Sequence, residues 1–295
     1  MKNIIVITGG AGFVGANLIS FLLKNTKYKI LSIDNYSSGL KINHIKNKKV
    51  KYIKGNTKNI STLLNSKKNK INAIFHFGEF SRIYQSFLKM GECIDSNTVG
   101  SHAVFNFCLN NKIKLIYSAT SASLGNKGRD KDLSPYAFTK SINLELLENL
   151  KKWFKMKYEI IYFYNVYGPK QISIGNMATV IGIFENAYKN KKPLPIVKPG
   201  TQSRKFTHIS DTVKVCYDAW KKNKCRHYSV SSKKDYSILE VAKLFGSKIK
   251  LLPARSGERY ASALTNMNLS NKVYKKFGKI SLKTYIEKFK NAHKR

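Results

Sequence analysis

A tyrosine and a lysine four positions apart are the first residues in this chain that could carry out chemistry together. Tyr136 and Lys140 follow Ser134-Pro135, where the serine can cap a helix and the proline suits its first turn. On such a helix the phenol and the ammonium group lie on one face. A free phenol ionises only at about pH 10, and a neighbouring positive charge favours its ionised form. The pair therefore predicts a tyrosine acid/base, although a surface helix pair has the same spacing.

A glycine-rich segment near the start of the chain predicts a dinucleotide-binding turn. Thr8-Gly-Gly-Ala-Gly-Phe-Val-Gly15 follows a β-branched run, so glycines 9, 12 and 15 fall between a strand and a helix. Glycines there permit a tight turn and let the backbone approach a pyrophosphate at the helix N-terminus. Asp34 ends the next strand-like run, where a carboxylate suits the ribose hydroxyls of NAD and repels the 2′-phosphate of NADP.

Strand-like runs alternate with helical stretches over the first half of the chain. These runs begin at Ile4, Ile30, Val50, Ala73, Lys114 and Glu159, and helical stretches are expected near 59–66, 83–109 and 135–155. The alternation indicates βαβ units and an α/β fold with a doubly wound parallel Rossmann sheet.

The regular alternation ends after the sixth strand, which predicts a second domain. We expect residues 1–164 to form an NAD-binding Rossmann domain, with 206–232 returning to its sheet. Residues 165–205 and 233–295 are expected to form a smaller, mostly C-terminal α/β domain that binds the substrate.

The charge of the chain is extreme. Its 295 residues include 54 lysines and arginines against 16 aspartates and glutamates, a formal net charge of +38. Only seven of the basic residues are arginines, which nucleic-acid surfaces favour for bidentate contacts. The lysines are scattered and accompany many asparagines and isoleucines, as in proteins encoded by A+T-rich genomes. We therefore expect no nucleic-acid partner, although the charge could steer anionic ligands.

The cysteines and the hydropathy pattern indicate the cellular compartment of the protein. Cys93, Cys108, Cys216 and Cys225 form no C-x-x-C pair and have no histidine at metal-ligand spacing, so neither a metal site nor a disulfide framework is expected. A strand-like run already begins at Ile4, so no signal peptide is expected. No apolar run reaches the length of about 18 residues that a spanning helix needs. The sequence predicts a cytoplasmic protein without a membrane segment.

The motifs in combination resemble a known family over nearly the whole chain. Thr8–Gly15, Asp34-Asn35, Tyr136-x-x-x-Lys140 and Tyr164-Asn-Val-Tyr-Gly-Pro169 are similar to motifs of the extended short-chain dehydrogenase/reductase family, specifically its NAD-dependent nucleotide-sugar epimerases and dehydratases. The resemblance implies that Tyr136 is the catalytic acid/base and that Lys140 binds the nicotinamide ribose. It also places the hydroxyl that bonds the reacting group at Thr120, with Ser118 as the rival candidate.

The resemblance also implies binding residues. NAD would contact Gly9, Gly12, Phe13, Val14, Gly15, Asp34, Asn35, Asn56, Thr57, Phe77, Gly78, Glu79, Asn97, Ser118, Tyr136 and Lys140. The nucleotide sugar would contact Ser81, Arg82, Ser86, Thr120, Asn165, Asn176, Arg204, Arg255 and Glu258, with Arg204 and Arg255 clamping the diphosphate.

Three positions depart from the family pattern or refine it. Asn56 stands in place of an aspartate that recognises adenine, and its amide oxygen can accept the same hydrogen bond. Glu79 replaces a small residue. Ser262 is small where glucose/galactose-only epimerases can have a bulky side chain, which would admit 2-N-acetyl sugars.

The residue at position 122 distinguishes between the reactions that enzymes of this family catalyse. Dehydratases and decarboxylases of this family generally have a glutamate two positions after the catalytic threonine, whereas this chain has Ala122. Without that base, the resemblance favours oxidation at C4, rotation of the keto sugar and hydride return to its other face. We therefore expect an NAD-dependent nucleotide-sugar 4-epimerase acting on a UDP-hexose.

Alternative functions remain open. Within the family, the chain could be a nucleotide-sugar dehydratase, decarboxylase or reductase, and outside it a non-catalytic NAD-binding or polyanion-binding protein. The helical stretches 93–109 and 135–155 resemble those through which the family pairs, so a homodimer is expected.

Overall fold

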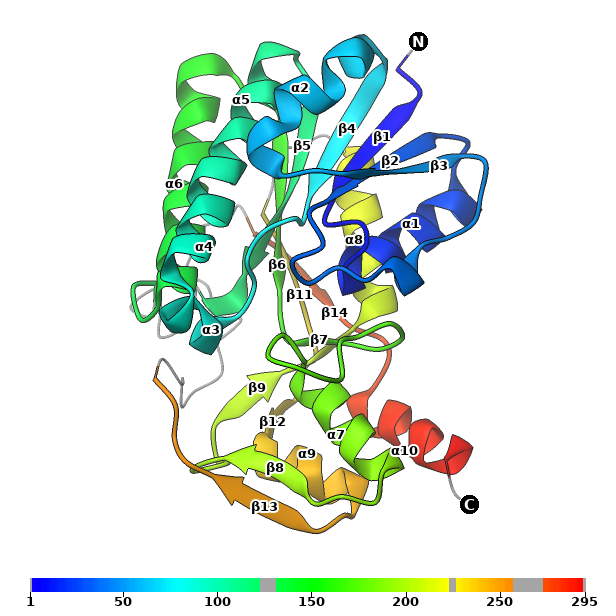
Figure 1. Cartoon of the computed structure of the whole chain (residues 1–295), viewed down its shortest axis with the longest axis vertical. Helices are drawn as coiled ribbons and strands as arrows, with labels where there is room; N and C mark the ends of the chain where they lie inside the picture. The colour runs from blue at the N-terminus through cyan, green and yellow to red at the C-terminus, as the bar shows by residue number, and fades with distance from the viewer. Residues whose placement is uncertain (1, 123–130, 223–226, 257–272, 294–295) are drawn as a thin grey trace.

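The chain folds around an eight-stranded parallel sheet. The computed structural model describes residues 2–122, 131–222, 227–256 and 273–293. In the order β14-β11-β6-β5-β4-β1-β2-β3, the strands of the sheet are Val273–Phe277, His227–Ser231, Tyr158–Phe163, Lys114–Thr120, Ile71–His76, Ile4–Thr8, Lys29–Asp34 and Val50–Lys54. Because the chain runs outward from β1 to β3 and then returns to β4, the order reverses between β1 and β4 (Figure 1). Ligands of such sheets bind at the carboxyl ends of the strands at this point.

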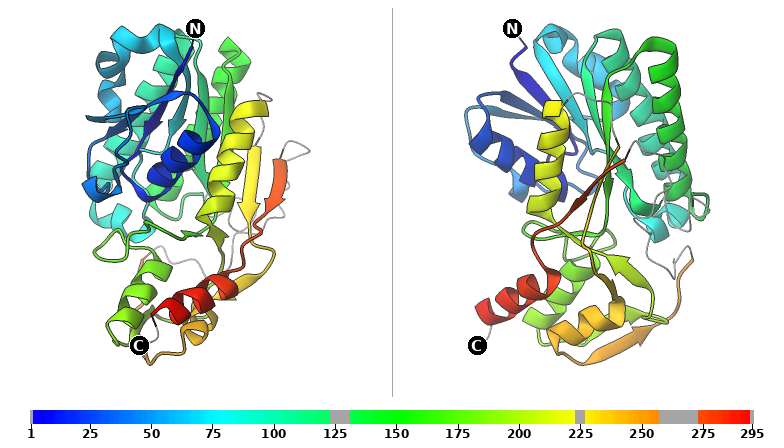
Figure 2. Two further views of the ribbon diagram at one scale, coloured as in Figure 1. Left: turned by 90° about the vertical axis from the view of Figure 1, so that its right-hand side faces the viewer. Right: turned by 180° about the vertical axis from the view of Figure 1, so that it is seen from behind.

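Helices cover both faces of the sheet, as expected for a doubly wound fold. On one face lie α2 (Ile60–Leu64), α4 (Met90–Ile94), α5 (Ser101–Asn110) and α6 (Pro135–Phe154), and on the other lie α1 (Phe13–Asn25) and α8 (Ile209–Lys222) (Figures 1 and 2). Fully buried side chains such as Phe105 and Leu147 fill the first layer, while Leu18 and Cys216 fill the second. The predicted α/β class with a Rossmann sheet is confirmed.

Short helical turns connect these elements. They are the 3₁₀ turns η1 (Lys41–Asn43), η2 (Thr57–Asn59) and η3 (Asn65–Lys70), the helix α3 (Ile83–Leu88) and the π-helical turn η4 (Asp95–Gly100). The single helical stretch expected over 83–109 is therefore divided, because α3 ends at Leu88 and η4 separates α4 from α5.

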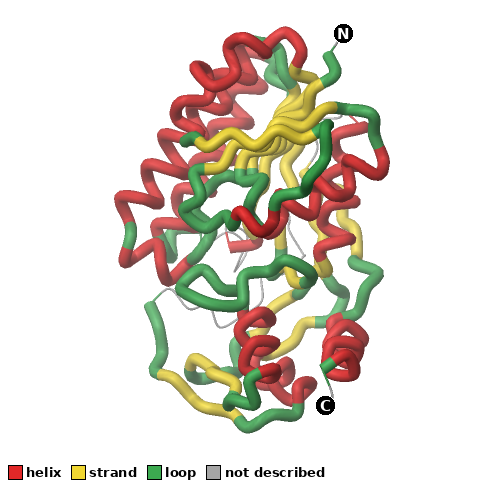
Figure 3. The backbone as a smooth tube through the Cα atoms, turned by 45° about the vertical axis from the view of Figure 1, so that its right-hand side comes forward, coloured by secondary structure: helices red, strands yellow, loops and turns green. Residues whose placement is uncertain are grey.

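A smaller lobe lies beyond the carboxyl ends of the strands (Figure 3). It contains α7 (Val180–Lys189), β8 (Leu194–Val197), β9 (Ser203–Lys205), β12 (Asp235–Ser237), α9 (Ile238–Phe245), β13 (Ile249–Leu252) and α10 (Leu282–Ala292). Strand β8 pairs with β13, β9 pairs with β12, and the short strands β7 (Val166–Tyr167) and β10 (Thr207–His208) pair near the main sheet. Phe184, Phe206 and Phe245 are fully buried in the core of this lobe.

The described part of the chain contains no helix that is both long and apolar enough to cross a membrane. It also contains no group of three or more histidine, cysteine, aspartate or glutamate side chains arranged to hold a metal ion.

Candidate active site

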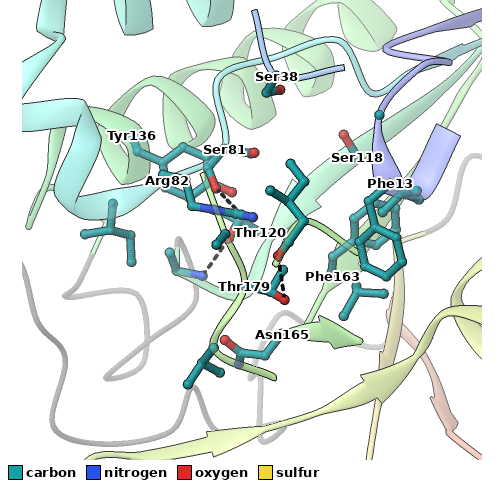
Figure 4. A pocket seen from close by; sticks show the side chains of 18 of the residues that line it. Phe13, Ser38, Ser81, Arg82, Ser118, Thr120, Tyr136, Phe163, Asn165 and Thr179 are labelled. Atoms are coloured by element: carbon teal, nitrogen blue, oxygen red, sulfur yellow. Dashed lines mark hydrogen bonds between the residues drawn. The ribbon is translucent and has the colours of Figure 1, made fainter. Parts of the chain in front are cut away.

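One cavity extends from the glycine turn to the smaller lobe. Its volume is about 520 Å³, and most of the residues expected to bind NAD or substrate line it: Gly9, Gly12, Phe13, Val14, Gly15, Asp34, Asn35, Phe77, Gly78, Ser81, Arg82, Ser118, Thr120, Tyr136, Lys140, Asn165, Arg204 and Arg255. Figure 4 shows Tyr136, Arg82 and Thr120 on one side of it, and Phe13 and Phe163 on the other. Residues distant in sequence therefore share one space.

The glycine turn is shaped for close approach of backbone to backbone and to a ligand. Gly9 has a φ of +72°, and a Cβ there would lie 2.9 Å from the Cα of Gly78. A Cβ on Gly15 would lie 2.2 Å from the carbonyl oxygen of Gly9, so a larger residue would push helix α1 off the turn. The open N-terminus of α1 faces the cavity, as a pyrophosphate site requires.

Asp34 lies at the ribose side of this turn. Its carboxylate accepts hydrogen bonds from the backbone N–H groups of Ala11 at 2.9 Å and Tyr36 at 2.8 Å. Burial raises the pKa of Asp34, while these hydrogen bonds and the nearby His44 act in the opposite direction. Backbone contacts thus fix the carboxylate at the edge of the cavity, and the cradle and this acid together fit the pyrophosphate and ribose of NAD.

Helix α6 supplies the tyrosine and lysine. Ser134 caps the helix by accepting a hydrogen bond from the N–H of Ala137 at 3.1 Å, and Pro135 occupies its first turn. Tyr136 and Lys140 then both reach the cavity. Lys140 donates hydrogen bonds to the carbonyl oxygen of Ser118 and to the carboxylate of Glu79.

Two hydroxyl groups at the end of β5 have different surroundings. The Ser118 hydroxyl donates to the carbonyl oxygen of His76 at 3.0 Å. The Thr120 hydroxyl oxygen accepts from the N–H of Ala122 at 3.1 Å. The hydroxyl group of Ser118 thus donates within the sheet, and both Ser118 and Thr120 line the cavity.

Two arginines reach the cavity from the smaller lobe. Arg204 lies on β9 and is 9% exposed, and Arg255 follows β13 with its guanidinium 5.2 Å from the ring centre of Tyr84. Guanidinium groups match phosphate oxygens in geometry and charge. Asn165, also on the cavity, donates to the carbonyl oxygen of Lys205 at 2.9 Å.

Several predicted residues lie away from this cavity. Asn56 and Asn176 line a second hollow of about 320 Å³, which Asn35 also borders. Thr57 is buried against Gly100, and Asn97 exchanges two hydrogen bonds with the backbone of Phe80 at 2.6 and 3.0 Å.

The remaining predicted positions include two that the structure does not describe. The Ser86 hydroxyl is buried and accepts from the N–H of Tyr136 at 3.2 Å. Glu79 lies behind the wall of the cavity, beside Lys140. Glu258 and Ser262 fall outside the described residues.

Sequence reasoning missed the contribution of α7. Thr179 caps this helix by accepting from the N–H of Gly182 at 3.0 Å, and it lines the cavity (Figure 4). A threonine directly before an apolar helical pattern is the signal that could have marked it. Gln202 and Phe206 line the cavity as well, but no local pattern distinguishes them.

The fold and the site define a two-lobed, NAD-binding enzyme of the α/β class. The chain belongs to the NAD dependent epimerase/dehydratase family, whose model matches residues 5–231. This confirms the family resemblance and NAD as the cofactor. Members of the family act on nucleotide sugars.

Individual relatives agree with this family and differ in their named reactions. The chain is 28% identical over 266 residues to a dTDP-D-glucose 4,6-dehydratase of Dictyostelium discoideum, covering 81% of this chain and only 60% of the relative. It is 30% identical over 229 residues to an uncharacterized UDP-glucose epimerase of Bacillus subtilis, covering 71% of this chain and 70% of that protein.

A solved structure shows the same fold along the full chain. The UDP-glucose 4-epimerase of Thermotoga maritima, solved with UDP-glucose, superposes with a TM-score of 0.85. The match covers 99% of this chain and 100% of that protein at 21% sequence identity. At this identity the match establishes the fold.

Proposed function

We propose that this protein is an NAD-dependent 4-epimerase of a nucleotide sugar, with a UDP-hexose as substrate. The observation that carries the proposal is that the described wall of the cavity holds no acid where an elimination reaction would need one. Among the described residues that line it, Asp34 is the only carboxylate, and it lies at the glycine turn. At position 122, where a glutamate would serve elimination, the cavity wall is the methyl group of Ala122.

The residues of the cavity support proton transfer at one carbon of the sugar. Tyr136 would accept the proton of the C4 hydroxyl and later return it, while Thr120 would hold that hydroxyl in place. Lys140 would keep a positive charge beside the phenol and bind the ribose next to the nicotinamide. Bound NAD supplies the hydride acceptor and donor at C4, so that return to the opposite face inverts the carbon.

The smaller lobe supports retention of the substrate between the two hydride transfers. Arg204 and Arg255 would hold the diphosphate, leaving the sugar ring as the part that turns. Apolar side chains such as Ile172, Ile181 and Phe206 line this end of the cavity and would keep water from the keto sugar.

The named reaction of one relative favours a second candidate. The Dictyostelium protein is called a 4,6-dehydratase, and a dehydratase would share the oxidation at C4. It would need a base at the neighbouring carbon, and the described cavity wall offers none there. The products separate the two candidates, since elimination gives a 4-keto-6-deoxy sugar.

The test is a product assay with a panel of nucleotide sugars. Purified protein is incubated with UDP-glucose, UDP-N-acetylglucosamine and dTDP-glucose without added NAD, and C4 epimers are followed by NMR. We expect epimers of the UDP sugars, with the acetylated sugar accepted if Ser262 admits it. A 4-keto-6-deoxy product would overturn the epimerase assignment.

A pair of variants tests the proposed acid/base. Tyr136→Phe should lower turnover by about 10²–10⁴-fold while NAD stays bound, because only the phenol hydroxyl is removed. Tyr188→Phe, at a partly buried tyrosine packed against the core of the smaller lobe, is the matched control and should turn over like the wild type. Full activity of Tyr136→Phe would refute the assignment.

The second part of the proposal is a homodimer. Helices α3, α4 and α6 contact one another and expose an apolar face made of Phe87, Leu88, Met90, Ile94, Phe138 and Ile142, each 39–63% exposed. Such a contiguous apolar face is typical of a protein–protein interface. Ile94, Phe138 and Ile142 fall within the stretches 93–109 and 135–155, which resemble the pairing helices of the family, and the other three residues precede the first stretch.

A further inference from the structure

Glu79 is a buried acid in contact with the lysine of the active site. Its side chain is 2% exposed and pairs with Lys140, which is 4% exposed. The resemblance to the family predicts a small residue here, so this carboxylate is a particular feature of the chain. It does not line the cavity and therefore acts on any ligand only through its neighbours.

A chain of hydrogen bonds with one possible direction leads to Glu79. The Thr8 hydroxyl oxygen accepts from the N–H groups of Phe77 at 3.1 Å and Gly78 at 3.0 Å, so its own hydrogen must go to Nδ1 of His76, 2.7 Å away. His76 then carries its hydrogen on Nε2 and donates it to Ser101, at 2.9 Å.

The last step of this chain ends on the carboxylate. The Ser101 hydroxyl accepts from His76 and donates to Oε1 of Glu79 at 2.7 Å. Burial lowers the pKa of His76 to about 4, which keeps this ring neutral with a single hydrogen. The network therefore requires an acceptor at Glu79.

Three further donors converge on the same carboxylate. Tyr117 donates to Oε1 at 3.0 Å and Asn143 donates to it at 3.2 Å, while Lys140 donates to Oε2. Burial and the charge of Glu79 raise the pKa of Tyr117, so that its hydroxyl stays a donor. Because every partner donates, Glu79 is held as an anion.

The same contacts fix the position of the lysine. Lys140 donates to Glu79 and to the carbonyl oxygen of Ser118, and its ammonium lies 4.7 Å from the ring centre of Tyr117. Two of its three hydrogens are thereby used within the protein. The third can point into the cavity that Lys140 lines.

We propose that Glu79 is a positioning residue that orients Lys140 and balances its charge, and so sets how readily Tyr136 ionises. The inference rests on the proposed roles of Tyr136 and Lys140. With Glu79 in place, Lys140 stabilises the ionised phenol of Tyr136 less than an unpaired lysine would. The other positive charges beside the phenol, those of Arg82 and of bound NAD, then contribute a larger share of the stabilisation of its ionised form.

The other titratable groups around Glu79 do not compete with this effect near neutral pH. They are His76 from β4, Cys93 from α4, Tyr117 from β5 and Lys140 from α6. His76 is neutral there, and burial raises the pKa values of both Cys93 and Tyr117. Removal of the charge of Glu79 should therefore mainly change how readily Tyr136 ionises.

The test compares Glu79→Gln and Glu79→Ala with the wild-type holoenzyme. Each is assayed for the pH dependence of kcat and, by ultraviolet difference titration against the matching Tyr136→Phe protein, for ionisation of Tyr136. We expect the acidic limb of the profile and the Tyr136 titration to move to lower pH by about one unit or more, because the lysine is no longer balanced.

Glu159→Gln provides a matched control. Glu159 is a second fully buried glutamate paired with a lysine, Lys114, at 3.3 Å on the main sheet and away from the cavity. Its removal should lower thermal stability and leave the Tyr136 titration unchanged. It thus separates the loss of any buried ion pair from the loss of this one.

Two outcomes would overturn the proposal. The first is a fall of kcat by the same factor at every pH with an unmoved Tyr136 titration, as a merely structural role gives. The second is failure of both Glu79 variants to fold while Glu159→Gln folds. The titration needs no sugar, so a failed epimerase assay would leave this test intact.

Discussion

The guanidinium of Arg82 donates two hydrogen bonds to the carbonyl oxygen of Met177, with Nε at 3.0 Å and Nη2 at 2.6 Å. This contact joins the loop after β4 to the loop before α7 across the cavity. Burial lowers the pKa of Arg82, and the nearby Tyr136 acts in the opposite direction, which places the cation next to the proposed acid/base. The residue thus links the two lobes beside the proposed site of reaction.

Substitution of Arg82 should weaken substrate binding more than its charge alone suggests. Arg82→Lys keeps the charge but loses the planar group that donates two hydrogen bonds to the Met177 carbonyl oxygen. We therefore expect KM to rise about tenfold, which corresponds to about 1.4 kcal/mol of binding free energy. Steady-state kinetics with the accepted nucleotide sugar measure this. Met177→Ala keeps the carbonyl and should have a KM near that of the wild type. An unchanged KM in Arg82→Lys would contradict the linking role.

Asp34 should determine the choice between NAD and NADP. Its carboxylate is fixed by two backbone N–H groups at the ribose end of the cavity. Asp34→Asn removes the charge that repels a 2′-phosphate and the strongest acceptor for the ribose hydroxyls. We expect NAD affinity to fall by about tenfold, as for loss of a charged hydrogen bond, and NADP affinity to rise.

Binding of both cofactors by fluorescence titration measures this change. Asp132→Asn, at an exposed aspartate outside the cavity, is the control and should bind NAD like the wild type. Retained preference for NAD in Asp34→Asn would show that another group discriminates between the cofactors.

Local spacing was sufficient to predict the parts of the site that lie on single elements. The glycine turn follows from residues 9, 12 and 15, and the shared face of Tyr136 and Lys140 follows from helix geometry. Inner strands such as β1, β5 and β6 were predictable because each is a short apolar run buried on both faces of a parallel sheet.

Contacts between distant elements could not be predicted in this way. Glu79 and Lys140 are 61 positions apart, and only the pairing of β4 with β5 and the docking of α6 bring them together. The resemblance identified Glu79 as unusual and placed it along the cofactor. Its side chain turns away from the cavity because Lys140 and three neutral donors supply its partners on the other side.

The apolar face should form the dimer interface. Phe138 is 51% exposed on α6, and burying a side chain of this size is worth about 1.5–3 kcal/mol. We expect a dimer in the wild type by light scattering and a monomer in Phe138→Glu, because the charge would be buried without a partner. Ile42→Glu, at an apolar residue 88% exposed on η1, is the control and should stay dimeric. A wild-type monomer at all concentrations would refute the homodimer.

His76 should make the stability of the protein depend on pH. Burial lowers its pKa to about 4 in the folded protein, whereas an unfolded histidine titrates at about 6.5. Between these two pH values the unfolded chain binds more protons, so the free energy of unfolding falls as the pH falls. At about 1.4 kcal/mol per pH unit, the loss between pH 7 and pH 5 is about 2 kcal/mol.

The variant His76→Gln isolates this contribution from that of other titrating groups. Its amide can accept from Thr8 and donate to Ser101 without a site that protonates, so the network that holds Glu79 is retained. In urea unfolding at pH 7 and pH 5, the wild type should lose about 2 kcal/mol more than the variant. Equal losses in the two proteins would mean that His76 accepts a proton in the folded state. The ring would then donate from both nitrogens, and the single direction of hydrogen bonding from Thr8 to Glu79 would be lost below that pH.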